Sequence, residues 1–291
     1  MAAIALRFHH ELRPRTEEMD MENQFARIDS IQVRYRQSAR KGAPVVVMTN
    51  AWPQSLRCWD SHWSDLASEY HLLAYDMPGF GLSEGKKELM SPSAQSDFLL
   101  RLVDHFEIQS FYGIGPDVGL PVMLSFAEKY PERIEGLTIF NGPGFYPPDV
   151  SWELGILFHS RVVRAVTAYF GRAFARVAMA RGYRNFQPEP SALAEYETIN
   201  RDPARFRLTL DFLGSYPAEL AHIGENLDKI AGPVQVLWGE KDPFLSVRNA
   251  HRLAERIPSA QLRILKGCGH FAHEDAGPEF TELVRSHQQS G

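Results

Sequence analysis

The chain of 291 residues has few cysteines, no long hydrophobic run and no large excess of charge of either sign. Two cysteines, Cys58 and Cys268, exclude a disulfide framework and the paired spacing of a zinc site. No apolar run reaches the roughly 18 residues of a membrane-spanning helix, and the first ten residues lack the apolar core and flanks of a signal peptide. A cytoplasmic protein without a membrane partner is therefore expected.

The charge pattern also limits the partners. The formal net charge is −5, and acidic and basic residues are mixed along the chain. No basic face predicts nucleic-acid binding, and no polybasic run predicts attachment to anionic lipid. No nucleic-acid partner is therefore expected.

What the chain does contain is a regular alternation of strand and helix patterns. The apolar run at 43–50 predicts a strand buried on both faces of a parallel sheet. Residues 71–84 predict another buried strand, followed by a Pro/Gly turn. Residues 91–106 begin with Ser and Pro and place apolar residues at helical spacing, which predicts a helix. The alternation predicts an α/β fold, with a mostly parallel sheet covered by helices on both faces.

The alternation is interrupted once. Residues 144–226 show helical patterns rich in Arg, Ala, Phe and Tyr, without a buried-strand run. We expect residues 25–143 and 227–291 to form the core, residues 144–226 to form a helical cap, and residues 1–24 to be an arm without regular structure. An insertion after a sheet strand lies at the carboxyl ends of the strands, where open α/β sheets bind ligands. The cap is therefore expected to roof a pocket.

Three polar residues follow predicted buried strands, in the order Asp117, Asp242 and His270. Asp117 is the centre of a G-P-D-V-G turn before a helix. Each residue alone has an ordinary explanation, since Asp117 can cap a helix, Asp242 can start a turn and His270 can be structural. Because parallel strands end side by side, the three can also meet. Their order is that of a nucleophile, an acid and a histidine, which favours a catalytic triad.

The motifs around these residues resemble the α/β-hydrolase superfamily. The matching segments are "YDMPGFGLSE", "YPERIEGLTIFN", "WGEKDPF" and "GCGHFAHED". The resemblance covers nearly all the chain beyond about residue 25 and implies the α/β-hydrolase fold. Aspartate in place of serine at position 117 is similar to the branch that contains epoxide hydrolases and haloalkane dehalogenases.

An aspartate nucleophile indicates a particular chemistry. A carboxylate with an ordinary pKa of about 3.9 is already ionised at pH 7 and can attack an sp³ carbon directly. The resulting ester can be hydrolysed with His270 as general base for water, while Asp242 orients the imidazole. The oxyanion hole is expected from the backbone N–H groups of Val118 and Trp52. This route needs no metal and no organic cofactor.

The resemblance also separates the two activities of this branch. Haloalkane dehalogenases place a tryptophan after the nucleophile, where this chain has Val118. Epoxide hydrolases donate a proton to the epoxide oxygen from tyrosines of the cap. Tyr216 and Tyr169 are nearest to the expected positions of these donors, and His159 and Tyr183 are the further candidates. Any of these tyrosines could instead be a core residue with its hydroxyl at the edge.

The leading prediction is therefore a hydrolase that opens an epoxide of a hydrophobic small molecule. Trp52, Asn50 and Tyr183 are the predicted substrate-binding residues. A haloalkane or haloacid dehalogenase is one alternative. Pro116 and the unusual "NAWP" loop keep open a non-hydrolytic enzyme of natural-product biosynthesis, such as one that performs a cyclisation or coupling. A binding protein is the third class, and the complete set of Asp117, Asp242 and His270 argues against it.

Overall fold

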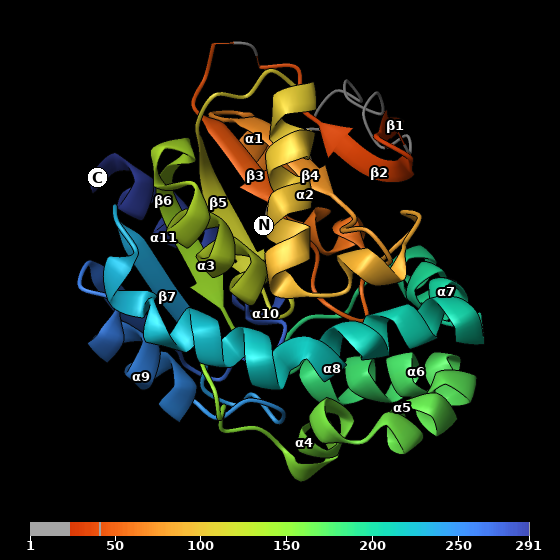
Figure 1. The fold of residues 1–291 in the computed structure, drawn as a ribbon. Helices are drawn as coiled ribbons and strands as arrows, with labels where there is room; N and C mark the ends of the chain where they lie inside the picture. The colour runs from red at the N-terminus through yellow and green to blue at the C-terminus, as the bar shows by residue number, and fades with distance from the viewer. Residues whose placement is uncertain (1–23, 41, 291) are drawn as a thin grey trace, which may run out of the picture.

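The apolar runs of the sequence form the centre of an eight-stranded sheet. A computed structural model describes residues 24–40 and 42–290 (Figure 1). The strand order is β1-β2-β4-β3-β5-β6-β7-β8. β1 and β2 form an antiparallel hairpin, β2 pairs antiparallel with β4, and all other pairs are parallel. The strands are β1 (Gln24–Ile28), β2 (Ile31–Gln37), β3 (Val45–Met48), β4 (His71–Tyr75), β5 (Phe111–Pro116), β6 (Ile134–Phe140), β7 (Val234–Gly239) and β8 (Ala260–Leu265).

Helices cover both faces of the sheet, because the central strands are apolar on both sides. One face packs against α2 (Pro92–His105), α3 (Gly119–Lys129) and α9 (Arg248–Arg256). The other face packs against α1 (Trp63–Ala67), α10 (Ala272–Ala276) and α11 (Pro278–Ser290). The predicted α/β fold with a mostly parallel sheet is confirmed. Four short 3₁₀ helices complete this part: η1 (Leu56–Trp59), η2 (Lys87–Leu89), η3 (Pro131–Arg133) and η5 (Leu227–Lys229).

The predicted 91–106 helix shows how local sequence sets an element's ends. The Ser91 side chain accepts a hydrogen bond from the Ala94 backbone N–H, and Pro92 occupies the first helical position. Both features stabilise a helix start, where backbone N–H groups have no partner within the helix. The observed helix, α2, ends at His105, one residue before the predicted end.

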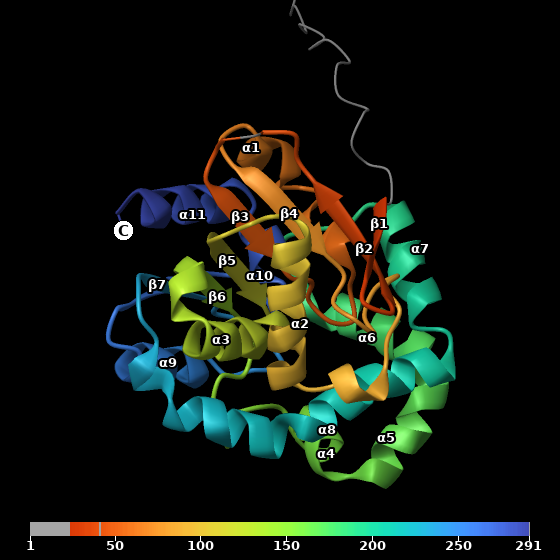
Figure 2. The same cartoon turned by 45° about the horizontal axis from the view of Figure 1, so that its top comes forward.

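Between β6 and β7 the structure is helical. We call residues 144–226 the helical insertion. It contains α4 (Trp152–His159), α5 (Arg161–Thr167), η4 (Ala168–Phe170), α6 (Gly171–Gly182), α7 (Pro190–Ile199) and α8 (Pro203–Glu225). These helices lie beyond the carboxyl ends of the strands (Figures 1 and 2).

The insertion is tied to the core by arginines. Arg34 Nη1 of β2 lies 2.6 Å from Glu195 Oε1 of α7, and Ser55 Oγ donates to the same oxygen. Arg205 of α8 donates to the carbonyl oxygen of Ser83 at 2.6 Å. These contacts fix the insertion over the loops that follow the parallel strands.

Two further predictions concern the N-terminal arm and membrane-spanning helices. Residues 1–23 of the predicted arm lie outside the described residues, and Gln24 belongs to β1. Within 24–40 and 42–290, no helix is long and apolar enough to cross a membrane.

Candidate active site

Asp117 lies in the turn between β5 and α3. Its φ is 45°, in the left-handed region that non-glycine residues rarely adopt. The backbone of this turn packs closely against Thr49. Only glycine fits at position 119, because a Cβ there would lie 1.8 Å from Thr49 Oγ1. Strained backbone of this kind is concentrated at functional sites, where the surrounding packing maintains it.

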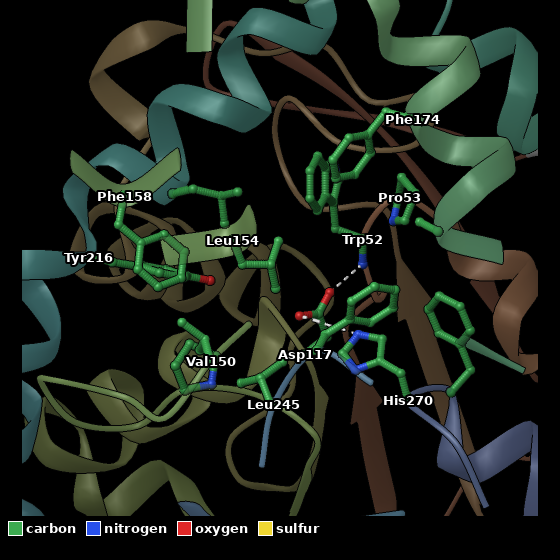
Figure 3. Close-up of a pocket in the computed structure, with 15 residues that line it drawn as sticks. Trp52, Pro53, Asp117, Val150, Leu154, Phe158, Phe174, Tyr216, Leu245 and His270 are labelled. Carbon is green, nitrogen blue, oxygen red and sulfur yellow. Dashed lines mark hydrogen bonds and ion pairs between the residues drawn. The ribbon is translucent and has the colours of Figure 1, made fainter. Parts of the chain in front are cut away.

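The Asp117 carboxylate has different surroundings at its two oxygens (Figure 3). Oδ2 accepts a hydrogen bond from the Trp52 backbone N–H at 2.8 Å. The Val118 N–H also hydrogen-bonds to the carboxylate. Oδ1 lies 3.8 Å from His270 Nε2. The structure thus brings both predicted oxyanion-hole N–H groups to this side chain.

The protonation of Asp117 follows from opposing effects. Burial raises its pKa to about 6, while His270 and the N–H groups of Trp52 and Val118 favour the ionised form. The ionised form therefore predominates at pH 7. A carboxylate that has lost most of its water is more reactive than a hydrated one.

His270 and Asp242 form a pair beside Asp117. His270 Nδ1 lies 2.9 Å from Asp242 Oδ2, and Asp242 Oδ1 accepts from the backbone N–H groups of Phe244 and Leu245. Burial opposes the charge on the imidazole, but Asp242 and Asp117 outweigh it and raise the pKa of His270. The pair can hold a proton on His270 while Nε2 faces the pocket.

Asn141 is a further polar residue of the site and is absent from the predicted set. It directly follows β6 and has a φ of 47°. Its Nδ2 donates to Asp242 Oδ2 at 2.7 Å, and its Oδ1 accepts from the Gly239 N–H at 3.1 Å. Asn141 therefore positions Asp242. Its place after a buried strand, which it shares with Asp117, is the sequence pattern that could have identified it.

A mostly apolar pocket lies between these residues and the insertion (Figure 3). Its cavity volume is about 40 Å³, which is more than the roughly 10–15 Å³ that a cavity needs to hold water. The insertion contributes residues from three helices. These are Leu154 and Phe158 of α4, Phe174 and Ala178 of α6, and Leu213 and Tyr216 of α8.

Tyr216 supplies a hydroxyl to this pocket. Its side chain is buried, and Figure 3 shows the hydroxyl directed into the pocket, toward the side on which Asp117 lies. Among the described residues the hydroxyl has no hydrogen-bond partner. Burial and the nearby Asp117 charge raise the pKa of Tyr216 well above its ordinary value. The hydroxyl is therefore protonated and available as a donor.

Tyr169, the other predicted proton donor, does not reach the pocket. It belongs to η4, and 76% of its surface is exposed. The reserve His159 is also exposed, near Tyr146 at the outer end of α4. Spacing along the chain placed Tyr169 near the expected donor, but the turn of the helix directs it to solvent.

The three predicted substrate-binding residues have different positions. Trp52 lines the pocket and stacks on Phe206 at a ring-centroid distance of 5.6 Å. Asn50 is buried and does not line it, since its amide donates to the Ala51 carbonyl and accepts from the Met77 N–H. Tyr183 lies outside it too, and its hydroxyl donates to Glu274. The prediction that Asn50 and Tyr183 line the substrate pocket is therefore corrected.

The described residues hold no group of three or more His, Cys, Asp or Glu side chains suited to a metal ion. The polar groups at the pocket are instead the carboxylate, imidazole, hydroxyl and N–H groups described above.

Comparison with known proteins agrees with this architecture. The family model described as the alpha/beta hydrolase fold matches residues 44–277, so the chain belongs to the α/β-hydrolase fold family. The 2-hydroxy-6-oxononadienedioate/2-hydroxy-6-oxononatrienedioate hydrolase of Cupriavidus pinatubonensis (strain JMP 134 / LMG 1197) is 24% identical over 252 residues. That match covers 84% of this chain and 86% of the relative.

Two solved structures share the fold. The 2-hydroxy-6-oxo-6-phenylhexa-2,4-dienoate hydrolase of Rhodococcus sp. strain RHA1 superposes with a TM-score of 0.78 and 20% identity, over 92% of this chain and 98% of that one. An ancestral haloalkane dehalogenase superposes with a TM-score of 0.79 and 20% identity, over the same shares. The chain is thus an enzyme of the α/β-hydrolase type, a hydrolase acting on a small molecule.

Proposed function

We propose that this protein hydrolyses epoxides of hydrophobic small molecules through a covalent ester on Asp117. The observation that carries the proposal is the arrangement around one carboxylate. Asp117 Oδ2 accepts the Trp52 N–H and Oδ1 faces His270. The Tyr216 hydroxyl, which has no hydrogen-bond partner among the described residues, points into the same apolar pocket. The helical insertion acts as the cap of this site.

In the first step Asp117 Oδ1 attacks an epoxide carbon, and the ring C–O bond breaks. Tyr216 donates its hydroxyl proton to the departing oxygen, which becomes an alcohol. Because burial and Asp117 keep Tyr216 protonated, the donor is ready before the substrate enters. The new ester bond joins Oδ1 to the substrate, and Oδ2 becomes its carbonyl oxygen.

In the second step His270 removes a proton from a water molecule, whose oxygen attacks Cγ of Asp117. Negative charge develops on Oδ2, which accepts the Trp52 N–H. The Val118 N–H, which also hydrogen-bonds to the Asp117 carboxylate, adds to the stabilisation of this charge. The ester C–O bond then breaks, and His270 returns its proton to the departing diol oxygen. The second proton of the water replaces the one that Tyr216 donated, so all groups are restored.

The ester also prepares His270 for this role. The Asp117 charge is one of the causes that raise the pKa of His270. Esterification removes that charge, so the imidazole loses its proton more readily when a base is needed. Asp242, held by Asn141 and two backbone N–H groups, keeps the ring oriented throughout.

Dehalogenation is the second candidate, and one observation favours it. The indole Nε1 of Trp52 is buried and, within the described residues, has no hydrogen-bond partner. It could hold a halide. The Val118 side chain offers no N–H at the position after the nucleophile, whereas the Tyr216 hydroxyl suits a leaving oxygen that needs a proton. We therefore favour the epoxide.

Isotope labelling tests the ester route. The enzyme, in excess over styrene oxide, reacts once in ¹⁸O water, and the diol and the peptide containing Asp117 are examined by mass spectrometry. The ester route predicts ¹⁸O in Asp117 and an unlabelled diol, since water attacks the carboxyl carbon. The peptide containing Asp242 serves as the internal control and should remain unlabelled.

The outcomes separate the candidates. Label in the diol with none in Asp117 would contradict the ester and indicate direct attack by water. Bromide release from 1-bromobutane, with no turnover of aryl or alkyl epoxides, would favour dehalogenation. If Asp117→Asn turned over the natural substrate at the wild-type rate, a non-hydrolytic reaction would replace the proposal.

A further inference from the structure

Exposed apolar side chains are concentrated in one part of the molecule. Of the nine large hydrophobic residues that are exposed among those described, Phe25 alone lies outside the helical insertion. Trp152 is 77% exposed and Val162 73% exposed. Large apolar side chains clustered in this way on a surface usually mark an interaction site.

Helical spacing arranges these residues in stripes. Trp152 and Ile156 are four residues apart on α4, and Val162, Val166, Tyr169 and Phe170 follow one face through α5 and η4. On α6, Ala173, Val177 and Ala180 form a third exposed stripe, which continues from Phe170 of η4. Because α4 contacts α5, and η4 contacts both α5 and α6, the stripes adjoin. We call these residues the apolar face of the insertion.

The apolar face lies away from the sheet. Figures 1 and 2 both show α4 and α5 at the outer end of the insertion, beyond α8 as seen from the sheet. The opposite sides of α4 and α6 line the pocket through Leu154, Phe158, Phe174 and Ala178. Two of the three helical segments are therefore apolar on two sides, and the pocket accounts for the inner side alone.

Arginines surround the apolar face. Five exposed arginines lie on or next to these helices: Arg161, Arg172, Arg176, Arg181 and Arg184. Two acidic residues pair with three of them, Glu197 with Arg172 and Arg176, and Glu153 with Arg181. Residues 152–184 contain a single acidic residue, Glu153, while the whole chain has a net charge of −5. The positive charge is thus local to this end of the molecule.

We propose that the apolar face docks on the surface of an anionic lipid membrane. Helices with exposed Trp, Tyr and Phe beside arginines bind at the boundary between headgroups and acyl chains. Anionic headgroups complement the arginines, and the acyl region accepts the apolar stripes. Docking places the pocket directly behind the membrane surface.

Tryptophan fluorescence gives a specific readout. Trp152 is exposed, whereas the other four tryptophans, Trp52, Trp59, Trp63 and Trp238, are buried. The full chain is mixed with vesicles of phosphatidylcholine alone, or of equal parts phosphatidylcholine and phosphatidylglycerol. We expect a blue shift and co-sedimentation with the anionic vesicles alone, both weakened in about 0.5 M salt, where screening is strong. Trp152→Phe should keep binding and lose the shift.

The variant that tests the surface is Trp152→Ala/Tyr169→Ala/Phe170→Ala. It should lower the vesicle partition coefficient about tenfold or more, because the apolar contacts are removed. Phe25→Ala removes an exposed aromatic side chain outside the insertion and should bind as the wild type does. Because the three side chains are exposed, the fold should be retained, which circular dichroism checks.

Three results would overturn the proposal. The first is absence of binding to anionic vesicles. The second is equal binding by the triple variant and the wild type. The third is a dimer in analytical ultracentrifugation that the triple variant dissociates, without vesicle binding, which would assign the face to a second copy of the chain.

Discussion

The pocket has a floor formed by loops of the core and a roof formed by helices of the insertion. The two differ in how many polar groups they contain and in the hydrogen bonds that these groups make. The floor consists of Trp52, Asp117, Asp242 and His270, from loops after parallel strands, and its carboxylates and imidazole contact N–H groups or one another. The roof, from α4, α6 and α8, is apolar apart from the Tyr216 hydroxyl. The floor is organised for chemistry before substrate arrives. The roof closes over the floor and leaves an apolar space of about 40 Å³ between them.

The largest expected effect comes from the floor. His270→Gln should lower turnover about 10⁴-fold, because ester hydrolysis loses its base while Asp117 can still attack. The ester should accumulate, and intact-protein mass spectrometry should show an adduct of the mass of styrene oxide. The exposed His251 provides the control variant, His251→Gln, which should react normally. Wild-type turnover by His270→Gln would remove His270 from the mechanism.

A roof substitution should have a smaller and substrate-dependent effect. Tyr216→Phe should slow epoxide opening about 10²-fold or more, because the departing oxygen loses its proton donor. Alkyl bromides need no proton, so any reaction with them should be unaffected. Tyr169→Phe is the matched control and should match the wild type, because Tyr169 lies on the surface. Equal effects of the two substitutions on epoxides would contradict the role of Tyr216.

A third substitution tests the hydrogen bond by which Asn141 positions Asp242. Asn141→Ala should lower kcat about tenfold, because Asp242 loses a hydrogen bond and holds His270 less well. Without that donor, more of the negative charge on Asp242 acts on His270, so the upward shift of the His270 pKa should increase. The pH profile of single-turnover ester hydrolysis measures this shift. A lower kcat with an unchanged profile would indicate a purely structural role, and Asn185→Ala is the exposed control.

The last effect concerns stability rather than turnover and has the opposite sign. Burial raises the Asp117 pKa from 3.8 to about 6, so ionised Asp117 destabilises the fold above pH 6. That penalty decreases between pH 6 and 3.8 and disappears below it. Asp117→Asn should therefore be more stable by about 3 kcal/mol at pH 7.5, with the difference gone near pH 4. Urea unfolding at both pH values measures this, with the exposed Asp228→Asn as control.

The sequence predicted residue positions correctly where the residues directly follow buried strands of the sheet. Buried strands have a strong apolar pattern, and parallel strands end at one edge, so Asp117, Asp242 and His270 could be placed together from the positions of the runs alone. The backbone N–H groups of Trp52 and Val118, which the resemblance implied, also lie at the Asp117 carboxylate. Asn141 obeys this rule as well, although its role depends on a hydrogen bond that spacing does not specify.

The sequence predicted less well which side chains of the helical insertion face the pocket. Tyr216 and Tyr169 are both helical tyrosines near the expected positions, yet one is buried and the other is on the surface. Which side of a helix faces the pocket depends on how the helices pack, and no sheet fixes their rotation. Tyr183 illustrates the same limit, because its hydroxyl pairs with Glu274, far along the chain.

The sequence by itself determined the order of strands and helices and the three polar residues at the strand ends, because local apolar patterns define each element. Tertiary structure decided which hydroxyl enters the pocket, which amide supports Asp242 and where the apolar face forms. Charge and apolar residues that are mixed along the chain separate onto one surface in the folded insertion. That separation depends on helix packing, which brings together side chains that are distant in sequence.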